Sequence, residues 1–410
     1  MEYTRKTTVI LLIGLCLAAV YGHPSLEAGQ RLLGVREWRF DGEVDESTVS
    51  CVHGHYPPPF CTATNVALKH DTKHFIVYSK DADVEFANQY LFRVSAEPRD
   101  NFPECHQTIE EAYVFTFYFY HGHSNYFHLH KDTLFPIFLL LRQRTSDTPV
   151  VLMPVVELRR MAEVDWDSGA FSEKHLDKYF IQTLKTLAGT DNAILPLDSD
   201  LIKASPHGHT CFRKAFIGAP SLRSVERSPS FMSDFVEFMM ARLDVQPGHP
   251  GTPLVGIIKR AGRRKILNED ELVTACSRFV QTELVEFSGM SVREQVSAVQ
   301  KYTVLVGMNG AGFMNAIYLP KGAVSIQLAP YNATQLNVKE FGEIVGSRGP
   351  YLFWRNEHSD LTRPVPGDVF NSQANTLVHV SEFEALVQQA LALGVNKDLW
   401  TPESERKTEL

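Results

Sequence analysis

The second half of the chain alternates short apolar runs with stretches of helical periodicity. The runs Leu254–Ile258, Thr303–Val306 and Ala323–Leu328 are mostly apolar, which predicts strands buried on both faces. Ser291, followed three residues later by Glu294, predicts a capped helix start between the first two runs. This alternation is typical of βα units that build a parallel sheet.

The first half shows the same alternation ahead of a segment dense in proline and glycine, Gln246–Pro253. Its clearest helical pattern begins near Asn125 and continues to Leu141 with apolar residues on one face. Its strand-like runs are 74–78, 112–120, 150–153 and 211–217. We expect an α/β protein with two Rossmann-like, doubly wound domains, residues 46–245 and 254–400, which face a central cleft across the linker 246–253.

A glycine-rich turn follows the strand-like run that ends at Val306. Gly307, Gly310 and Gly312 allow a tight turn, and a short apolar helix follows that ends before Pro320. The N-terminus of a helix favours a phosphate or diphosphate. The alternative is a turn that only lets the helix pack on the strand. The order G-x-x-G-x-G, near the C-terminus, argues against a dinucleotide fingerprint.

A basic loop follows the strand-like run that ends at Ile258. Lys259–Lys265 carries five positive charges in seven residues. Guanidinium groups bind phosphate oxygens in pairs, so Arg260, Arg263 and Arg264 favour a diphosphate ligand. The alternative is a solvated loop, the usual meaning of a charge run. The glycine turn is expected at the same edge of the sheet, which favours a binding site.

The segment Ser124–Asp132 carries the clearest acid–base candidates. On a helix, Asn125, His128 and Asp132 fall on one face. Transfer of a group onto a hydroxyl needs a base that removes the hydroxyl proton, and a neutral histidine or a carboxylate can serve. His128 and His130 fall on different faces, which argues against a two-histidine metal site. The alternative is a buried histidine–aspartate pair in the core.

Trp354 and Arg355 are a third candidate group. An indole can stack on a uracil ring or a sugar, and a guanidinium can meet a phosphate. The alternative is that Trp354 belongs to the core.

In combination, the runs Met308–Gly312, Leu319–Ala323 and Trp354–Asn356 resemble glycosyltransferase family 61, and the match extends from about Cys51 to Asn356. The resemblance implies a GT-B architecture of two Rossmann-like domains and a UDP-sugar donor. Two positions depart from the family pattern. Asn309 stands where the family has histidine, and Gln327 stands where it has an acid.

The resemblance implies donor-diphosphate binding by Arg260 and Arg264, which match the family's run, and we expect Arg263 and Lys265 to support them. We expect Asp132 or His128 to be the base. Asn125, which matches the family, and His130, which is one place away from the family's second histidine, are expected on the acceptor side. The donor-binding set is Arg260, Arg263, Arg264, Asn309, Gly310, Ala311, Gly312, Trp354 and Arg355.

The function implied by the resemblance is that of an inverting glycosyltransferase. The first candidate reaction moves GlcNAc from UDP-GlcNAc onto an O-mannose glycan or an EGF-domain Ser or Thr of a secretory glycoprotein. One alternative is xylosyl transfer within the same family. The other is a non-catalytic binder of a sugar nucleotide or glycan. We expect no metal site and no required cofactor, with Mn²⁺ as an option that the prediction does not need.

The two ends of the chain predict the endoplasmic-reticulum lumen. Residues 1–22 read as a cleaved signal peptide and 23–45 as a polar lead-in. The tail 401–410 ends in K-T-E-L, a variant of the retrieval address read by receptors of the KDEL type. No other stretch is apolar enough over sufficient length to span a bilayer, so no transmembrane segment is expected after cleavage.

Cysteines and charge agree with that compartment. Cys51 and Cys61 flank a proline-rich loop and are a candidate disulfide. Five cysteines remain after Cys16 leaves with the signal, so at least one thiol stays free or pairs with another chain. Asn332 begins a glycosylation sequon. The net charge of −8 argues against a nucleic-acid partner.

Overall fold

The computed structural model shows an α/β protein that groups into two compact units. It describes residues 47–52, 60–69, 74–78, 85–87, 93–116, 125–144, 149–155, 178–189, 193–194, 208–218, 229–248, 251–332, 338–366 and 373–395. The predicted signal peptide, polar lead-in and K-T-E-L tail lie outside these residues. Within them, no helix is long and apolar enough to cross a membrane.

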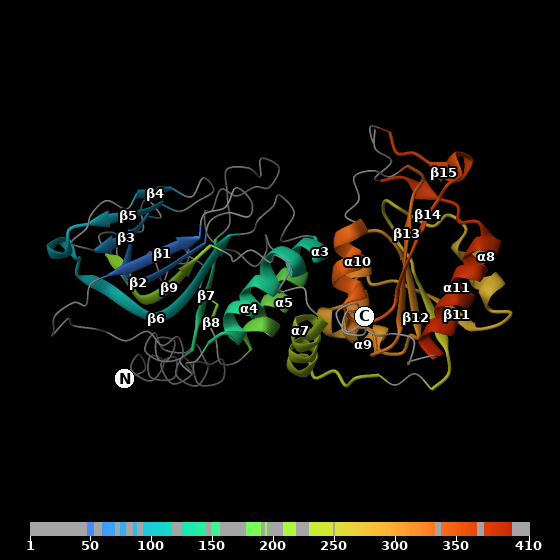
Figure 1. The fold of residues 1–410 in the computed structure, drawn as a ribbon, viewed down its shortest axis with the longest axis horizontal. Coiled ribbons are helices and arrows are strands. Elements are labelled where there is room, and N and C mark those ends of the chain that lie inside the picture. Colours follow the sequence, from blue (N-terminus) through green and yellow to red (C-terminus); the bar gives the residue numbers. More distant parts are fainter. Residues whose placement is uncertain are drawn as a thin grey trace, which may run out of the picture. The chain divides into compact units, whose positions relative to one another are not determined.

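The first unit contains a nine-stranded sheet in the order β4-β5-β3-β2-β9-β6-β7-β8, with β1 paired to β2 (Figure 1). Its strands are β1 (Thr48–Val52), β2 (Phe60–Lys69), β3 (His74–Tyr78), β4 (Glu85–Ala87), β5 (Arg93–Glu97), β6 (Cys105–Thr116), β7 (Val151–Val155), β8 (Ala193–Ile194) and β9 (His209–Ile217). One core cluster joins apolar side chains of β2, β3, β6 and β9.

This sheet is mixed, whereas a doubly wound sheet is expected from the sequence. β2 runs antiparallel to β1, β3 and β9, while β6 and β9 run parallel. The reason is connection length. Only residues 70–73 separate β2 from β3, and so short a connection allows an antiparallel pair but no parallel crossover.

The second unit contains a five-stranded parallel sheet in the order β11-β10-β12-β13-β14. This confirms the parallel sheet predicted for the second half. The strands are β10 (Leu254–Ile258), β11 (Gln281–Val285), β12 (Val304–Met308), β13 (Val324–Ala329) and β14 (Tyr351–Arg355), and a two-stranded ribbon pairs β15 (Thr362–Arg363) with β16 (Asn375–Thr376).

Helices cover both faces of this parallel sheet (Figure 1). α8 (Glu269–Cys276) and α11 (Val380–Val395) lie on one face, where their apolar side chains share a core with the strands. The other face carries α9 (Val292–Val299), α10 (Val338–Gly346) and the 3₁₀ helix η4 (Ala311–Tyr318). The expected capping box at Ser291 and Glu294 is present at the start of α9.

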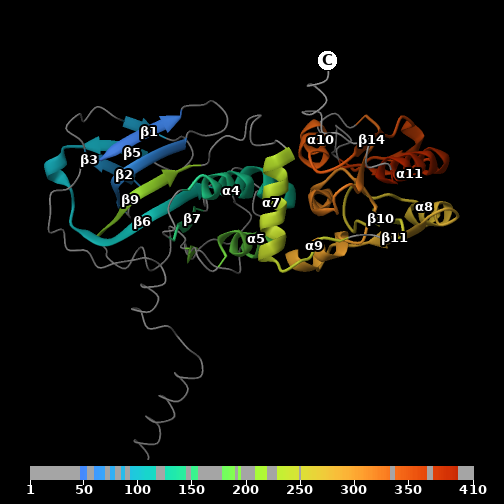
Figure 2. The same cartoon turned by 60° about the horizontal axis from the view of Figure 1, so that its bottom comes forward.

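Helices from the first half of the chain also belong to the second unit. They are α3 (Tyr126–His128), the π-helix η2 (Leu129–Leu134), α4 (Phe135–Arg142), α5 (Lys178–Ala188) and α7 (Pro229–Arg242). Figure 2 shows α7 between α4 and α5 on one side and α9 and α10 on the other. Arg348 joins these layers by donating to Ser233 Oγ at 2.8 Å and to Ile317 O at 3.2 Å. The expected linker 246–253 joins α7 to β10 inside this unit.

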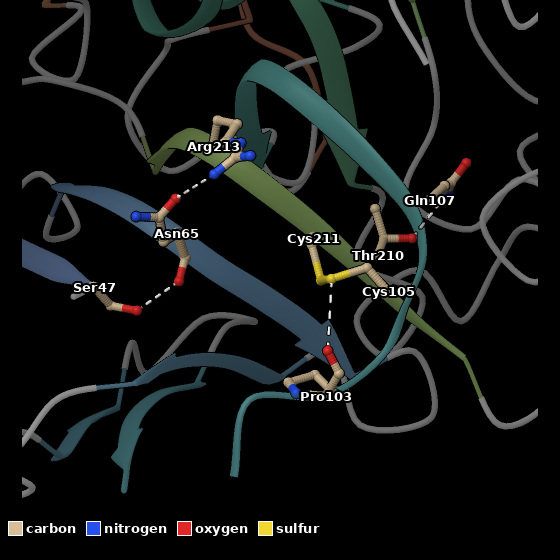
Figure 3. Close-up of a disulfide and its surroundings, with 8 residues drawn as sticks. All are labelled: Ser47, Asn65, Pro103, Cys105, Gln107, Thr210, Cys211 and Arg213. Atoms are coloured by element: carbon tan, nitrogen blue, oxygen red, sulfur yellow. Dashed lines mark hydrogen bonds between the residues drawn. A yellow bond between two sulfur atoms is a disulfide. The ribbon is translucent and has the colours of Figure 1, made fainter. Parts of the chain in front are cut away.

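A disulfide joins two neighbouring parallel strands of the first unit (Figure 3). Cys105 of β6 and Cys211 of β9 are bonded, with Cα atoms 5.7 Å apart. Cys61 is also disulfide-bonded, and Cys51 lies opposite it in the β1–β2 register. Cys276 is a free, buried thiol. The sequence shows that one thiol is left over, but nothing in it singles out the Cys105–Cys211 pair.

Removing the Cys105–Cys211 cross-link is expected to lower the free energy of unfolding by about 2–4 kcal/mol, because 106 residues separate the two cysteines and the bond limits the unfolded chain. Urea titration of the double variant Cys105→Ser/Cys211→Ser measures this loss. Cys276→Ala is the control, since it removes a buried thiol but no cross-link. An equal loss in both variants would contradict a stabilising role of the bond.

Candidate active site

The strand order of the parallel sheet marks one position for a ligand. β10 has β11 on one side and β12 on the other, so the chain reverses its winding direction between β10 and β12. Ligands of open α/β sheets bind outside the carboxyl ends of strands at such a switch point. The basic loop follows β10 and the glycine turn follows β12. The structure therefore brings the two predicted donor-binding segments together.

Arg260 lies directly over the glycine turn. Its Nε donates to Arg263 O at 3.0 Å. A Cβ atom on Gly310 would lie 2.2 Å from Arg260 Nη1, and Gly310 has a φ of +154°. Glycine is therefore required here both for the backbone conformation and for the close approach of the guanidinium. Burial, followed by the nearby Arg263 charge, lowers the pKa of Arg260. An anion beside this guanidinium would favour its charged form and so raise the pKa again, against both effects.

Arg264 and Asn309 form the second contact between the two segments. Arg264 has a φ of +58°, a left-handed conformation that is uncommon for residues other than glycine. Its Nη1 donates to Asn309 Oδ1 at 3.3 Å. Asn309 is buried, and its Nδ2 has no hydrogen-bond partner within the described part of the chain. A buried N–H donor next to two arginines fits an anionic oxygen.

The helix after the glycine turn is a 3₁₀ helix, η4, whose N-cap is Gly310. Its residues from Phe313 to Tyr318 are buried, while Ala311 and Gly312 are partly exposed. The first backbone N–H groups of a helix lack partners within the helix and carry a partial positive charge. The exposed first turn thus adds to the positive potential of Arg260 and Arg264.

His128 and Asp132 form the predicted histidine–carboxylate pair. His128 Nδ1 lies 2.7 Å from Asp132 Oδ2, and the side chains keep 23% and 15% of their exposure. α3 packs against η4, the helix that begins at the glycine turn. Both candidate clusters therefore belong to the same compact unit. A carboxylate that orients an imidazole is the arrangement that general-base catalysis uses.

Lys131 and Glu340 hold the helical segment that carries His128 against α10. Lys131 Nζ donates to both carboxylate oxygens of Glu340, at 2.7 and 2.8 Å, and lies 3.9 Å from Asp132 Oδ1. Beside this ion pair, Phe127 stacks on Phe341 with ring centroids 4.1 Å apart. The two contacts fix the turn that carries His128.

Asn125 and His130 make contacts within the protein. Asn125 Oδ1 accepts from the N–H groups of Phe127 and His128, which makes Asn125 the N-cap of α3. His130 is fully buried, with Nδ1 2.8 Å from Tyr126 O and Nε2 3.0 Å from Tyr318 Oη. The carbonyl can only accept, so Nδ1 carries the proton and Nε2 accepts from Tyr318. This placement gives His130 a structural role and does not support acceptor contact.

His130 is expected to make stability fall between pH 7 and pH 5. Burial lowers the pKa of His130 to about 4, while an unfolded histidine has a pKa of about 6.5. Between these values the unfolded chain binds the proton and the folded chain does not, so the stability present above pH 6.5 is lost as the pH falls. The loss from pH 7 to pH 5 is about 2 kcal/mol.

Unfolding by urea at the two pH values measures this loss, and His130→Gln is the comparison because glutamine does not titrate. The variant is expected to be less stable at pH 7 and to show a smaller change between the two pH values. The same change in both proteins would contradict a neutral, buried His130.

Trp354 and Arg355 lie on opposite faces of β14. Trp354 packs against the core beside α11, and its Nε1 donates to Glu382 at 2.9 Å. Arg355 is exposed, and its guanidinium lies 5.7 Å from the Phe353 ring centroid. Among the described residues, no hydrogen bond links Trp354 to Arg260 or Asn309. The geometry thus favours a core role for Trp354, and the donor-binding role of both residues stays a prediction.

Asn309 and Gln327, which differ from the family pattern, lie in different parts of the sheet. Asn309 is at the switch point, whereas Gln327 is buried in the middle of β13 and accepts from Tyr351 Oη. Asn332 is exposed at the carboxyl end of β13, and its glycosylation stays a prediction. Within the described residues, no group of three His, Cys, Asp or Glu side chains is placed to hold a metal ion.

Residues 126–326 match the family model of Glycosyltransferase 61. The resemblance to this family is confirmed. Similar curated proteins include protein O-linked-mannose beta-1,4-N-acetylglucosaminyltransferase 2 of Bos taurus, 28% identical over 261 residues that cover 58% of this chain and 41% of the relative. The Homo sapiens protein of that name is 27% identical over 257 residues, covering 57% and 40%. The chain spans about two fifths of the length of these relatives. In both comparisons, the chain is similar to glycosyltransferases.

The family 61 segment contains both candidate clusters. It begins at Tyr126, just before His128, and ends within β13, so it includes Arg260, Arg264 and Asn309. β14 and the segment 373–378 lie beyond it. Sequence reasoning missed the ion pair of Lys131 with Glu340, because 209 residues separate them and no local pattern connects them.

Proposed function

We propose that this chain is an inverting glycosyltransferase that moves a sugar from a UDP-sugar, UDP-GlcNAc first among the candidates, onto a protein-linked acceptor. The observation that carries the proposal is the contact between the basic loop and the glycine turn. There, Arg260 lies over Gly310, and Arg264 donates to Asn309. The choice of sugar is supported by the names of the relatives, which describe transfer of N-acetylglucosamine to O-linked mannose.

The proposed donor site is a diphosphate site. A nucleoside diphosphate brings two to three negative charges to the carboxyl edge of the sheet, opposite Arg260 and Arg264. A guanidinium presents paired N–H donors that match two phosphate oxygens. The first turn of η4 and Asn309 Nδ2 supply further donors. These groups would also stabilise the charge that develops on the leaving diphosphate during transfer.

The proposed reaction is a single displacement at the anomeric carbon. An acceptor hydroxyl oxygen attacks this carbon while its proton passes to the base. The bond from the anomeric carbon to the phosphate oxygen breaks, and UDP leaves with the electron pair. We assign the base to His128 and its orientation to Asp132, because the 2.7 Å contact between them fixes the imidazole. The anomeric configuration inverts because there is one displacement.

We place the reaction in the endoplasmic-reticulum lumen. The Cys105–Cys211 disulfide supports an oxidising compartment of the secretory pathway. The secretory glycoprotein acceptor and retrieval by a KDEL-type receptor belong to the same proposal. The acceptor class follows from the relatives' names, which specify a protein-linked O-mannose.

One observation favours a second candidate function, a binder of sugar nucleotides that does not catalyse transfer. Asn309 replaces the family's histidine at the switch point, and its amide can donate to a phosphate but cannot exchange a proton. This alternative predicts UDP binding without turnover.

Calorimetric titration with UDP, UMP and uridine in EDTA tests the donor site. We expect UDP to bind, UMP to bind about 10-fold more weakly and uridine more weakly still, because each loses phosphate contacts with the arginines. We also expect EDTA to leave the UDP affinity unchanged, since arginines and a helix terminus hold the charge. Equal affinity for UDP and uridine would contradict the diphosphate site, and a collapse in EDTA that Mn²⁺ reverses would contradict metal independence.

A further inference from the structure

The segment Gln373–Val378, which contains the short strand β16 (Asn375–Thr376), runs beside the basic loop. Two backbone hydrogen bonds join them, and a third is made by Leu267, two residues after the loop. The Arg264 N–H donates to Gln373 O at 3.2 Å, Thr376 N–H to Lys265 O at 2.9 Å, and Leu267 N–H to Thr376 O at 2.8 Å. Ile266 and Thr376 form a parallel bridge. The basic loop is thus built onto a segment more than a hundred residues away.

Two asparagine side chains, Asn375 and Asn268, add hydrogen bonds between the segment Gln373–Val378 and the chain that follows β10. Asn375 Oδ1 accepts from the Lys265 N–H at 2.9 Å, next to Arg264. Asn268 lies at the start of α8 and exchanges two hydrogen bonds with the backbone of Val378, both 2.9 Å long. Asn375 therefore fixes the part of the loop that carries the arginines, whereas Asn268 fixes the start of the helix.

The segment itself is firmly placed. Ala374, Thr376 and Val378 are buried. Leu377 N–H donates to Leu361 O at 2.8 Å, and Thr376 pairs with Thr362 in the β15–β16 ribbon. A buried strand segment that is bonded on both edges is a rigid support for a loop.

The basic loop needs such a support. Its five positive charges repel one another, and Arg264 sits in a left-handed conformation that costs about 1 kcal/mol. Without external bonds, the backbone would relax and the two guanidinium groups would separate from the glycine turn. The bonds to Gln373 and Asn375 fall on Arg264 and on Lys265, the residue after it.

We propose that the segment Gln373–Val378, through Asn375, positions Arg260 and Arg264 to bind the diphosphate of a nucleotide. The segment lies outside residues 126–326, which match the family model, so the donor site is incomplete without a part of the chain beyond that match. The inference rests on the proposed function of the switch-point site. Asn375 is a positioning residue, because it acts through Lys265 and Arg264.

Two measurements on the full chain test the proposal in Asn375→Ala. We expect UDP to bind about 10-fold more weakly, with the KM for the UDP-sugar rising and kcat changing little, because the variant misplaces the arginines rather than the base. We also expect faster hydrogen exchange in the peptide 259–267, since the Lys265 amide loses its acceptor.

The matched control is Asn268→Ala, which removes two hydrogen bonds to the same segment on the side away from the arginines. We expect it to lower the melting temperature at least as much as Asn375→Ala and to leave UDP affinity unchanged. Equal UDP affinity in Asn375→Ala and the unchanged chain, or equal weakening in both variants, would overturn the proposal.

If the unchanged chain does not bind UDP, the proposed function fails, and the exchange measurement then decides the positioning role by itself. Faster exchange of peptide 259–267 in Asn375→Ala, but not in Asn268→Ala, supports it. Unchanged exchange overturns it.

Discussion

Replacing Arg260 with alanine is expected to weaken UDP binding by roughly 10- to 100-fold and to reduce transfer at least as much. Hydrogen bonds to charged groups contribute about 1.5–3 kcal/mol each, and Arg260 supplies the guanidinium that lies over Gly310. The transfer rate falls further because Arg260 also stabilises the charge on the leaving diphosphate in the transition state. Calorimetry with UDP and the rate of UDP release measure the two effects.

The control for this change is Arg278→Ala. Arg278 is exposed, pairs with Glu384 and lies at the end of α8, so its removal changes the net charge equally without touching the switch point. We expect UDP affinity within a factor of two of the unchanged chain. Equal weakening by both substitutions would show a general charge effect and contradict a specific role of Arg260.

Replacing His128 with glutamine is expected to reduce kcat on the order of 10³-fold while UDP affinity is retained. Glutamine keeps hydrogen-bonding groups but accepts no proton, and general-base catalysis contributes about 10²- to 10⁴-fold. Asp132→Asn is expected to reduce kcat roughly 10²-fold or more, because the amide no longer orients the imidazole as the carboxylate does. Steady-state kinetics at saturating donor measures both losses.

Asp234→Asn is the matched control for the carboxylate change. Asp234 is on α7 in the same unit, is partly exposed and pairs with Arg142. We expect its kcat to stay unchanged. Full activity in His128→Gln would remove His128 from the role of base, and full activity in both His128→Gln and Asp132→Asn would contradict this site.

The sheet of the second unit is predictable because its signal is local. β10, β12 and β13 are short, mostly apolar runs, and the predicted run Leu254–Ile258 is identical in extent to β10. The strand order of the first unit's sheet cannot be predicted in this way, because strand pairing depends on connection lengths and on partners far apart in the chain. β2 pairs with β9, whose residues lie more than a hundred positions later.

The meeting of the basic loop and the glycine turn is predictable for a geometric reason. Parallel strands end at one edge of a sheet, so the loops after β10 and β12 meet there whatever their side chains are. What the local pattern lacks is the partner of each side chain. His130 is buried, and its Nε2 is satisfied by Tyr318, which lies 188 residues later. A sequence pattern around His130 alone cannot distinguish this core histidine from one that contacts an acceptor.

A local sequence pattern also cannot predict which of the two units a helix joins. The segment from Asn125 to Arg142 precedes the expected linker, yet it packs on η4 and α10 of the second unit. Its apolar face predicts burial but not against which sheet. Only the long-range contacts, such as Phe127 on Phe341, decide that it lies with the parallel sheet of the second unit.

The most direct test of transfer activity is acceptor-dependent release of UDP by the purified chain. UDP-GlcNAc, UDP-xylose, UDP-glucose and UDP-GalNAc are offered in turn with an O-mannosyl peptide or a folded EGF domain. The proposed function predicts release with UDP-GlcNAc and one of these acceptors, and its loss in Arg260→Ala. UDP binding without release from any pair would contradict catalysis and favour the binder, and absence of UDP binding would contradict the donor site itself.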